Sequence, residues 1–594
     1  MKIKIGTMYT YIDFEGKVSL RDKIRDMAHT TLGVKEDNAH YSRAYMSGHW
    51  DGITDFYDFK EDKFHTGLID QFLEGLRALQ EKDLSVEYEI VDERPSPLLN
   101  AEAIDEEIVL GNGDDSPITL RDYQYDAVKK VIQEQVGIVN AATNAGKTEV
   151  AAGVMQQILP YLKRGERIVF FTHRKEIFSM AAERIAVRLG LKPRDIGFIG
   201  DGKFNIKNKN IVFVMVPTLV SALKDPKKGL KFSHKERVIK TIAEDIVPKF
   251  KNTQNTRQLI RNYIKNNSQT TKIWQDIETH LTYVAYDKKF TDKSAQMHLN
   301  KYIVEFEKIM EKKNKDKYKK YKETLEFLES VKVLIADEVH HAKASTWYES
   351  FSMCENAIYR VGLTGTVDAK DKLGHQRLLA IFDRIIIKVS NEFLIKSGVS
   401  SKPTIRVIPI TEPRNLELVD NFMEAYKLGI VQNEYRNRAV VDLAVAYKKR
   451  RPGGILISVK EIEHGETILE MLREQGLEVE FINGGSEVDH RANQLLRFSQ
   501  GELPILIAST IIDEGVDMKS IGCMILAAGG KSMRQQLQRI GRGLRLNGID
   551  GNSVMVFDFK DQTNQYLLNH SKERKKIFLE EKFDVKDMDT KKKA

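Results

Sequence analysis

Apolar strands followed by small-residue turns and amphipathic helices recur along most of this chain. Polar residues come directly after a run of Val, Ile, Leu or Phe in GIVNAATNAGKT, RIVFFTHRKE, NIVFVMVPT, KVLIADEVHH and YRVGLTGT. Runs that are apolar at every position are typical of strands buried on both faces of a parallel sheet. Because the carboxyl ends of parallel strands carry the functional loops, we expect these polar residues at one edge of a sheet.

The same pattern begins again at Gly453, in GGILISVKE, EVEFINGG, PILIASTIIDEG and CMILAAGG. Strands that alternate with helices predict an α/β domain built on a parallel sheet. We therefore predict two such domains in tandem, over residues 118–395 and 396–560. Residues 561–594 are expected to form a C-terminal helix and tail.

Two further regions stand apart from this pattern. Residues 1–95 are predicted to form a small α+β accessory domain, joined by a linker at 96–117 that combines prolines, glycines and acidic residues. Residues 224–330 are rich in Lys, Asn and Gln, are patterned like helices, and separate NIVFVMVPT from KVLIADEVHH. They predict a helical insertion in the first α/β domain.

The composition excludes several classes of protein. Of the 594 residues, 41% are hydrophobic and 30% are charged, which is typical of a globular protein, and no apolar run is long enough to cross a bilayer. The first residues lack an apolar signal core, and two cysteines are too few for a disulfide framework. We expect a cytoplasmic protein without a membrane partner, in the host cytoplasm if the chain is of phage origin.

The distribution of charge is more informative than the net charge of +8. Residues 1–118 hold 13 basic and 25 acidic side chains, a net charge of −12, so the rest of the chain carries +20. Residues 225–330 alone hold 24 basic and 15 acidic side chains. Such an excess suits a polyanionic partner, although solubility alone could explain it. For the insertion, a solvated helical element, a nucleic-acid contact and a protein partner all stay open.

A phosphate-binding loop is predicted at AATNAGKT, residues 141–148, between a strand and a helix. Ala141 replaces the first glycine of the G-x-x-x-x-G-K-T pattern. Small residues let backbone N–H groups close around phosphate oxygens at the positive end of the following helix. Lys147 is expected to reach the β and γ phosphates of ATP, and Thr148 to bind Mg²⁺. The other loop residues expected to contact the nucleotide are Thr143, Asn144, Ala145 and Gly146.

A pair of carboxylates follows the apolar strand of VLIADEVHH. Asp337 is expected to hold Mg²⁺, a hard cation that prefers oxygen ligands. Glu338 would then orient and deprotonate the water that attacks the γ-phosphate. An acidic turn after a strand explains this segment alone, but not its pairing with the phosphate loop.

Two arginines in QQLQRIGRGLR complete the predicted catalytic set. Arg542 and Arg545 are three residues apart, which places both on one face of a helical turn. Planar and permanently charged guanidinium groups suit the charge that develops on a transferring phosphoryl group. We expect them, together with Gln538 of the same segment, to complete the site when the two α/β domains close. A basic surface helix is the simpler interpretation.

The ordered set of segments resembles the motifs of superfamily 2 helicases. RDYQYDAV is similar to their adenine-reading glutamine motif, AATNAGKT to motif I, DEVH to motif II, GLTGT to motif III, ASTIIDEGVD to motif V and QRIGRGLR to motif VI. The resemblance implies two RecA-like motor domains, with ATP bound between them. It also implies that Gln124 reads adenine and that Gly515 and Asp517 line the nucleotide cleft.

The same resemblance implies a path for one nucleic-acid strand across both motor domains, with 3′ to 5′ movement. Hydroxyls and helix N-termini bind phosphates without reading bases, so binding independent of sequence is expected. Each of these residues taken alone could equally cap a helix. The residues that match the family's strand-binding motifs are Thr172, Arg174, Thr218, Ser458 and Ser509.

The N-terminal stretch YSRAYMSGHWDGITDFYDFKEDKFHTGLI resembles that of UvsW-type phage recombination helicases. The shared core is Gly-x-Trp-Asp-Gly at residues 48–52, with Trp50 as a candidate nucleic-acid contact, and HSKERKKIF near the C-terminus is also similar. The resemblance implies action on branched DNA or single-strand/duplex junctions, in recombination, replication and repair. The acidic charge of this domain departs from what a duplex-binding module should show.

Three alternatives stay open. The motor subunit of a restriction system would share the motor motifs, although no paired-carboxylate-and-lysine nuclease motif stands out elsewhere in the chain. An RNA helicase is compatible because phosphate contacts hardly distinguish the two sugars. A nucleic-acid-binding protein with a degenerate ATP site is disfavoured by the intact Lys147, Asp337, Glu338 and Arg542. The oligomeric state is not predicted.

Overall fold

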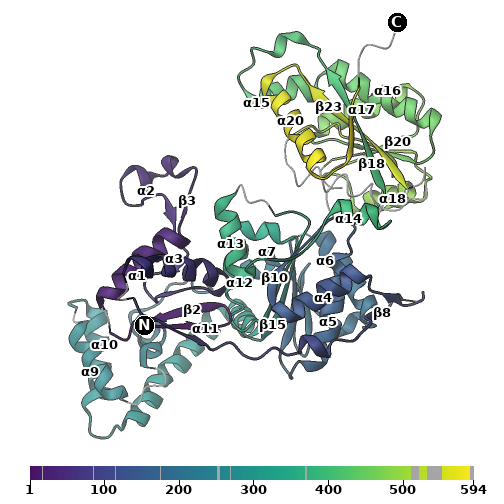
Figure 1. Cartoon of the computed structure of the whole chain (residues 1–594). Coiled ribbons are helices and arrows are strands. Elements are labelled where there is room, and N and C mark those ends of the chain that lie inside the picture. The colour runs from purple at the N-terminus through teal and green to yellow at the C-terminus, as the bar shows by residue number, and fades with distance from the viewer. Residues whose placement is uncertain are drawn as a thin grey trace. The chain divides into compact units, whose positions relative to one another are not determined.

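The computed structural model describes residues 1–588 except 17, 84–85, 114, 174, 251–254, 268, 368–370, 510–520 and 531–551. Three of its sheets have five, eight and seven strands, and the two larger ones are the predicted parallel sheets. The prediction of two RecA-like α/β domains, a small N-terminal α+β domain and a helical insertion is confirmed (Figure 1). None of the described helices combines the length and the apolar character that a membrane span requires.

The N-terminal domain is a mixed sheet with strand order β5-β6-β2-β1-β7, covered by two helices. Its core contains Ile3, Ile24, Phe64 and Phe72, each almost fully buried. A hairpin of β3 and β4 with the short helix α2 extends this domain. The elements are β1 (Lys2–Ile5), β2 (Tyr9–Asp13), α1 (Val18–Leu32), β3 (Val34–Lys35), α2 (Arg43–Met46), β4 (Ile53–Thr54), β5 (Tyr57–Asp58), β6 (Lys63–His65), η2 (Thr66–Leu68), α3 (Ile69–Lys82) and β7 (Glu89–Asp92).

The first motor domain has the strand order β13-β12-β14-β11-β15-β16-β10-β17, in which only β13 runs antiparallel. Its strands are β10 (Val136–Ala141), β11 (Arg167–Thr172), β12 (Ile196–Gly200), β13 (Lys203–Asn205), β14 (Ile211–Met215), β15 (Val331–Asp337), β16 (Tyr359–Thr364) and β17 (Ile385–Val389). Its helices include α4 (Asp122–Glu134), α5 (Lys147–Ile158), α6 (Lys175–Arg188), α12 (Ser345–Ser352), α13 (Lys372–Phe382) and α14 (Asn391–Lys396). In the chain, α7 (Val216–Ala222) follows β14 and begins the insertion.

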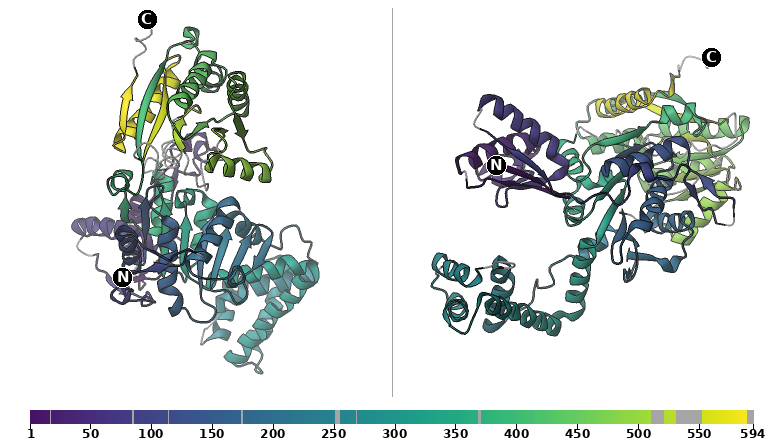
Figure 2. Two further views of the ribbon diagram at one scale, coloured as in Figure 1. Left: turned by 90° about the vertical axis from the view of Figure 1, so that its right-hand side faces the viewer. Right: turned by 60° about the horizontal axis from the view of Figure 1, so that its bottom comes forward.

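Two neighbouring residues of β11 show why the middle of this strand, Ile168 to Phe171, is apolar at every position. Phe170 packs with Phe213 in the core that α4, α5 and α6 share with the sheet. Phe171 points to the other face, where its ring lies 5.0 Å from that of Phe351 in α12. Helices therefore cover both faces of the sheet (Figures 1 and 2), as the apolar runs predict.

The insertion forms a compact unit of its own, residues 217–329. Its helices α8 (His234–Thr241), α9 (Thr256–Asn266), α10 (Lys272–Tyr286) and α11 (Asp292–Glu329) pack around a core that includes Trp274, Ile277 and Leu281. Those three residues recur at helical spacing, which is why the segment could be predicted as helical. The longest helix, α11, is kinked at Asn314, whose backbone angles are φ −159° and ψ 58°.

The second motor domain has the strand order β20-β21-β19-β22-β23-β18-β24, parallel throughout. Helices α16 and α17 share one core with the sheet, and α18 and α20 share another on the opposite face. The elements are β18 (Lys402–Ile410), α15 (Phe422–Tyr426), α16 (Glu434–Arg450), β19 (Gly454–Ser458), α17 (Ile462–Glu474), β20 (Val479–Ile482), α18 (Val488–Ser499), β21 (Ile505–Ala508), β22 (Ile521–Ile525), β23 (Ser553–Asp561), α20 (Gln565–Glu580) and β24 (Asp584–Asp587).

Candidate functional site

The phosphate loop and the DEVH and GLTGT segments lie at the same edge of the first motor sheet. Their strands β10, β16 and β15 are neighbours in that order and are paired in parallel. Asn140 is in register with Thr364, and Asp337 with Leu363. The carboxyl ends of the three strands therefore bring the predicted phosphate, metal and water-orienting residues together.

Two residues of the phosphate loop have left-handed backbone conformations. Asn144 has φ +80° and Gly146 has φ +78°, a region that glycine adopts without strain and asparagine tolerates. A Cβ on Gly146 would lie 2.3 Å from Gln124 Nε2, so only glycine fits there. The loop ends directly at Lys147, the first residue of α5, which places that lysine at the positive end of the helix.

The side chain of Gln124 holds this loop through a hydrogen bond. Its side chain is 4% exposed, and its Nε2 donates to the Ala145 carbonyl at 2.9 Å. Its Oε1 accepts from the backbone N–H of Arg121 at 3.0 Å and so caps the start of α4. Gln124 thus connects the first turn of α4 to the phosphate loop, while its adenine-reading role stays a prediction.

A buried carboxylate that the sequence did not single out anchors the helix behind the loop. Glu149, in the first turn of α5, is 6% exposed. Its Oε1 lies 2.7 Å from Arg184 NH2 and 3.3 Å from Arg188 Nε, both on α6. Breaking a buried pair of this kind leaves an unpaired charge, so the contact fixes α5 against α6. The sequence feature that could have indicated Glu149 is its position two residues after Lys147.

The oxygen donors at this edge fit a magnesium ion, which prefers one or two protein oxygens together with water and phosphate. Thr148 presents a half-buried hydroxyl in the first turn of α5, and Asp337 a carboxylate at the end of β15. Burial raises the pKa of Asp337 to about 7, repulsion from Glu338 adds to the rise, and the charge of Lys147 opposes it. A cation between these oxygens would offset the same unfavourable burial.

His340 connects the DEVH and GLTGT segments. Its Nδ1 lies 3.1 Å from Thr364 Oγ1 and 3.2 Å from Glu338 Oε2. The Thr364 hydroxyl donates its proton to the Thr366 carbonyl at 3.0 Å, so Nδ1 of His340 is the donor toward Thr364. With Glu338 in a left-handed conformation at φ +49°, this histidine helps to hold the carboxylate in place.

Helix α12 begins just after the DEVH segment and has two contact faces. On one face the Trp347 ring lies 5.9 Å from that of His341, which in turn lies 3.8 Å from that of His173, the residue after β11. On the other face Tyr348 and Ser352 contact His65 of the N-terminal domain, at 2.9 and 2.8 Å. The N-terminal domain therefore binds the helix that directly follows the predicted catalytic carboxylates.

The hydrogen bonds around His65 show which nitrogen of its ring carries the proton. Ser352 Oγ donates to the Tyr348 carbonyl at 2.8 Å, so it accepts from His65 Nε2. His65 Nδ1 is then the acceptor for the Tyr348 hydroxyl. The ring must be neutral to make both bonds, and burial, together with the charges of Arg360 and Lys63, lowers its pKa to about 3.

We expect this contact to be sensitive to acid. The unfolded chain titrates near the ordinary histidine pKa of about 6.5. Between pH 6.5 and 3 the unfolded chain binds the extra proton, so the free energy of unfolding falls as the pH falls. His65 should cost about 2 kcal/mol of stability between pH 7 and pH 5, measured by urea unfolding at the two values.

The control for this measurement is His65→Gln, which removes the titrating ring. His464 of the second motor domain is also buried, with its pKa lowered to about 3, and contributes in the same direction in both proteins. The difference between wild type and variant therefore isolates His65. An equal pH dependence in the two proteins would contradict the assignment.

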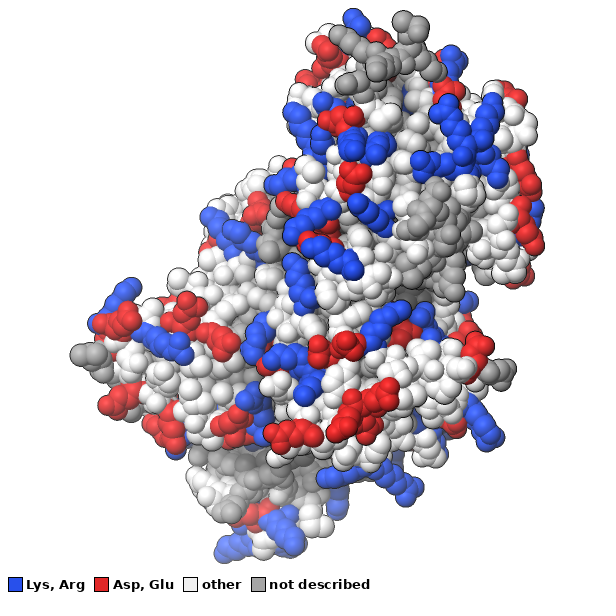
Figure 3. Space-filling view, turned by 45° about the vertical axis from the view of Figure 1, so that its right-hand side comes forward, with Lys and Arg blue, Asp and Glu red and all other residues white. Residues whose placement is uncertain are grey.

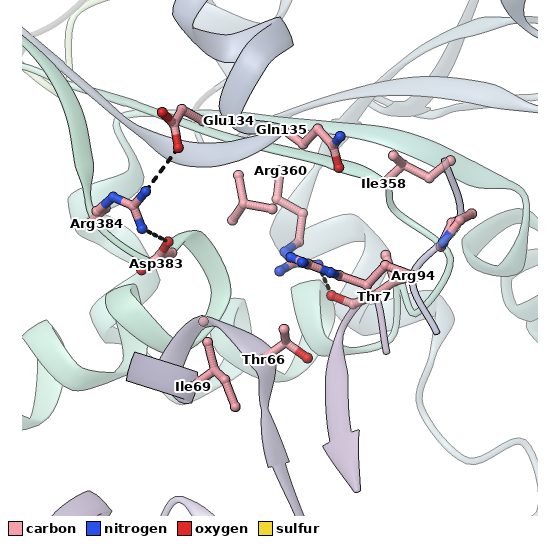
Figure 4. Close-up of a pocket in the computed structure, with 13 residues that line it drawn as sticks. Thr7, Thr66, Ile69, Arg94, Glu134, Gln135, Ile358, Arg360, Asp383 and Arg384 are labelled. Atoms are coloured by element: carbon pink, nitrogen blue, oxygen red, sulfur yellow. Dashed lines mark hydrogen bonds and ion pairs between the residues drawn. The ribbon is translucent and has the colours of Figure 1, made fainter. Parts of the chain in front are cut away.

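A cavity of about 150 Å³ lies at the opposite ends of these strands, between the N-terminal domain and the first motor domain (Figure 4). Arg360 is 2% exposed, donates to the Ile381 carbonyl at 2.8 Å, and also donates to the Thr7 carbonyl. Arg384 pairs with Glu134 and Asp383, each at 2.9 Å. Since Val136 and Ile358 mark the start of β10 and the approach to β16, this cavity is a domain contact, remote from the phosphate loop.

In the second motor domain Ser458 and Ser509 lie on neighbouring strand ends. Ser458 is the last residue of β19 and is in register with Ala508 of β21. Both serines are 8% exposed, and Ser458 Oγ is buried with no hydrogen-bond partner among the described residues. An orphaned hydroxyl at this edge is compatible with a ligand contact.

A buried ionic network holds the chain that follows β22. Arg436 pairs with Asp561 at 2.8 Å and Arg574 with Asp558 at 3.0 Å, and all four side chains are at most 1% exposed. Arg436 donates to the Ala527 carbonyl at 2.7 Å, and Arg574 to the Gly530 carbonyl at 2.8 Å. The Tyr426 hydroxyl also donates to the Ala528 carbonyl at 2.7 Å. Side chains thus bind three backbone carbonyl groups of one short turn. No role was predicted from the sequence for the side chains that bind them.

The other predicted strand contacts are spread over several elements. Thr172 is the last residue of β11 and is 1% exposed, and Thr218 is half-buried in the first turn of α7. Trp50 is half-buried and donates to the carbonyl of Ile53, the first residue of β4, at 2.6 Å. Acidic and basic side chains are interspersed on the face seen in Figure 3, so charge there does not mark a path.

Several predicted residues lie outside the described part of the chain. The residues concerned are Arg174, Gly515, Asp517, Gln538, Arg542 and Arg545. Their roles stay predictions from the sequence.

Two family models match this chain. The model described as "Type III restriction enzyme, res subunit" matches residues 117–240 and 240–369, and "Helicase conserved C-terminal domain" matches residues 436–547. Together they cover more than half of the chain, and they include every motif from the phosphate loop to QRIGRGLR.

Individual relatives are distant. The chain is 24% identical over 498 residues to "DNA 3'-5' translocase XPB2" of Sulfurisphaera tokodaii, covering 82% of this chain and 88% of that one. It is 24% identical over 290 residues to "ATP-dependent DNA helicase uvsW" of Enterobacteria phage T4, covering 44% and 55%. "Putative helicase 22" of Sulfolobus islandicus filamentous virus is matched over 43% of its length. The chain therefore spans less than two thirds of the length of this and several other relatives. The crystal structure of T4 UvsW aligns over 99% of both chains at 17% identity, with a TM-score of 0.39.

Proposed function

Because this chain belongs to the superfamily 2 helicases, a family of ATP-dependent helicases and translocases, we propose that it hydrolyses ATP to move along DNA. The observation that carries the proposal is the arrangement of Lys147, Asp337 and Thr364 at one edge of a parallel sheet. Asp337 and Thr364 end two adjacent strands, and Lys147 closes the loop that follows the third. A phosphate loop without the paired carboxylates would bind nucleotide but would lack a group to orient water.

Each residue of this edge has a distinct role in the proposal. Lys147 binds the β and γ phosphates, and Glu338, held beside His340, orients the attacking water and accepts its proton. Thr148 and Asp337 would hold Mg²⁺, which neutralises phosphate charge when bound. Arg542 and Arg545 of the second motor domain complete the site, so that hydrolysis and closure of the two domains depend on one another.

The finer part of the proposal concerns the nucleic acid. We infer 3′ to 5′ movement along one DNA strand, contacted through phosphates by residues such as Ser458 and Ser509. The substrate is branched DNA or a single-strand/duplex junction, processed in recombination, replication and repair. The similarity of the N-terminal segment around Trp50 to UvsW-type enzymes supports this choice.

A second candidate is the motor subunit of a restriction system. The description of the family model that matches residues 117–369 favours it. A restriction motor is expected to translocate on duplex DNA without strand separation, and it would require a nuclease partner. The two candidates differ in substrate, which makes them separable in one assay.

We expect ATP turnover by the full chain to be stimulated more by forked and four-way-junction DNA than by blunt duplex DNA. Turnover is measured with single-stranded, duplex, forked and four-way-junction DNA and with RNA of equal length. Stronger stimulation by long duplex DNA than by forks would favour the restriction motor. Stimulation by RNA alone would replace DNA as the substrate, and no turnover with any polymer would remove the motor proposal.

A further inference from the structure

The insertion exposes aromatic rings on the outer face of α10. Trp274, Ile277 and Leu281 of this helix point into the core, whereas Tyr283 and Tyr286 are 50% and 57% exposed. Large exposed aromatic side chains on a well-packed helical unit are a mark of a binding surface. Their amphipathic rings supply contact area at low conformational cost.

These rings are held in place by their neighbours. The Tyr283 ring lies 5.3 Å from that of Phe290 and 6.1 Å from that of His298, and the Phe290 and His298 rings are 5.1 Å apart. The edge-to-face contacts join the end of α10 to the first half of α11. Tyr283 is therefore positioned before any partner arrives.

A cation lies against one of these rings, and two more follow α10 in the sequence. The Arg261 guanidinium lies 4.9 Å from the Tyr286 ring centroid and donates to the Ala285 carbonyl at 2.9 Å. Lys288 and Lys289 are exposed in the turn that follows α10. We name Arg261, Tyr283, Tyr286, Lys288, Lys289 and His298 the aromatic–cationic patch.

The acidic residues nearest in sequence, Asp287 and Asp292, accept hydrogen bonds from backbone N–H groups. Asp287 Oδ1 accepts from the backbone N–H of Lys289 at 2.8 Å, and Asp292 Oδ1 from that of Arg257 at 2.7 Å. Both carboxylates therefore serve to shape the turns. Over residues 217–329, 25 basic and 15 acidic side chains leave a net charge of +10.

Charge selects the partner of the patch. The N-terminal domain also exposes large side chains, with Tyr41 at 77% and Met46 at 67%, but its residues 1–95 hold 13 basic and 19 acidic side chains, a net charge of −6. An exposed ring in an acidic region does not favour a polyanion, whereas rings among lysines suit one whose bases have flat faces. Bases of a duplex are stacked on each other, so a single strand fits the patch.

We propose that the aromatic–cationic patch is a second contact surface for single-stranded nucleic acid, made by other residues than those proposed for the strand path. Bases stack on Tyr283 and Tyr286, and phosphates lie against Lys288 and Lys289. The proposal rests on the proposed function, since a motor that moves along one strand must handle the strand it follows or displaces.

The test uses the full chain without ATP, and a fluorescent oligodeoxythymidine whose binding is followed by anisotropy over a range of salt concentrations. One variant, Tyr283→Ala with Tyr286→Ala, removes stacking, and a second, Tyr283→Phe with Tyr286→Phe, restores it. A third variant, Lys288→Gln with Lys289→Gln, removes two cations. Tyr161→Ala, at a residue that is 48% exposed in the first motor domain, is the matched control.

Stacking and charge give different signatures. Loss of one stacked base weakens affinity by roughly 5- to 150-fold, so we expect the alanine pair to bind at least about tenfold more weakly with an unchanged salt slope. The phenylalanine pair and the Tyr161→Ala control should bind like wild type. The lysine pair should lower the slope of log affinity against log salt by about 1.4. An abasic strand of equal length should bind wild type and the alanine pair alike.

Two results would overturn the proposal. Equal affinity of the alanine pair and wild type for the oligonucleotide would leave the patch to a protein partner, and so would equal binding of abasic and normal strands by wild type. ATP turnover measured on the same proteins separates this failure from failure of the motor proposal. A chain that binds through the patch but never hydrolyses ATP would retain the patch and lose the motor.

Discussion

The Lys147→Ala variant is expected to lose ATP turnover while it still binds DNA. Lys147 starts α5, and its Nζ donates to the Ala141 carbonyl of its own loop at 3.3 Å. Its removal therefore takes away a cation aimed at the phosphates without disturbing the sheet. Because removal of one preorganised group that stabilises a charged transition state costs about 10² to 10³ in rate, and this group also binds the ground state, we expect at least about a 10³-fold loss.

Turnover with saturating DNA is the measurement, and DNA affinity without ATP is the companion. Lys163→Ala, an exposed lysine just beyond α5 in the same domain, is the matched control and should leave both unchanged. A Lys147→Ala enzyme that turns over ATP within tenfold of wild type would show that this loop does not hold the reacting phosphates. Loss of DNA affinity as well would indicate that the variant is misfolded.

The sheets could be predicted because their strands are uniformly apolar and begin just before a small-residue turn. The strand of Ile211–Met215 is buried at all but its last position, and the sequence pattern alone marked it. The strand of Ile385–Val389 was not predicted, although four of its five residues are apolar. It lies at the edge of the sheet, where only Val389 is fully buried, and an apolar run does not show which strand a fold leaves at its edge.

Some features of the candidate site could be predicted from the sequence, and others could not. Asp337 and Glu338 could be named because they stand at the end of an apolar strand, and Lys147 because it closes a small-residue loop after another, and strand ends of a parallel sheet meet. Gln124 was named by resemblance, but its bond to the Ala145 carbonyl depends on how α4 packs against the loop. Periodicity does not encode such contacts.

Contacts between distant segments lie furthest from prediction. His65 binds Ser352, which is 287 residues away in the sequence, and nothing in either neighbourhood indicates the other. The same holds for Arg436 and Asp561, whose charges in isolation predict exposed positions. Buried polar groups are tolerated only when they take part in a network of hydrogen bonds and ion pairs, and that network forms only when the chain folds.

The Glu338→Gln variant is expected to bind ATP like wild type and to hydrolyse it about 10² to 10⁴ times more slowly. Glutamine keeps the volume of the side chain and an oxygen beside His340 Nδ1, which now lies 3.2 Å from Glu338 Oε2. It cannot accept the proton of the attacking water, so nucleotide binding and bond cleavage should separate. The readouts are the affinity for ATP and the rate of a single turnover.

The control for Glu338→Gln is Glu349→Gln, the same change at an exposed position of α12 on the same stretch of chain, which should leave both readouts unchanged. If Glu338 orients water, the variant should accumulate with ATP bound. A rate within tenfold of wild type would assign the water to another group. Weaker ATP binding at an unchanged rate would make Glu338 a ligand of the nucleotide, and the mechanism drawn from the edge of this sheet would then be wrong.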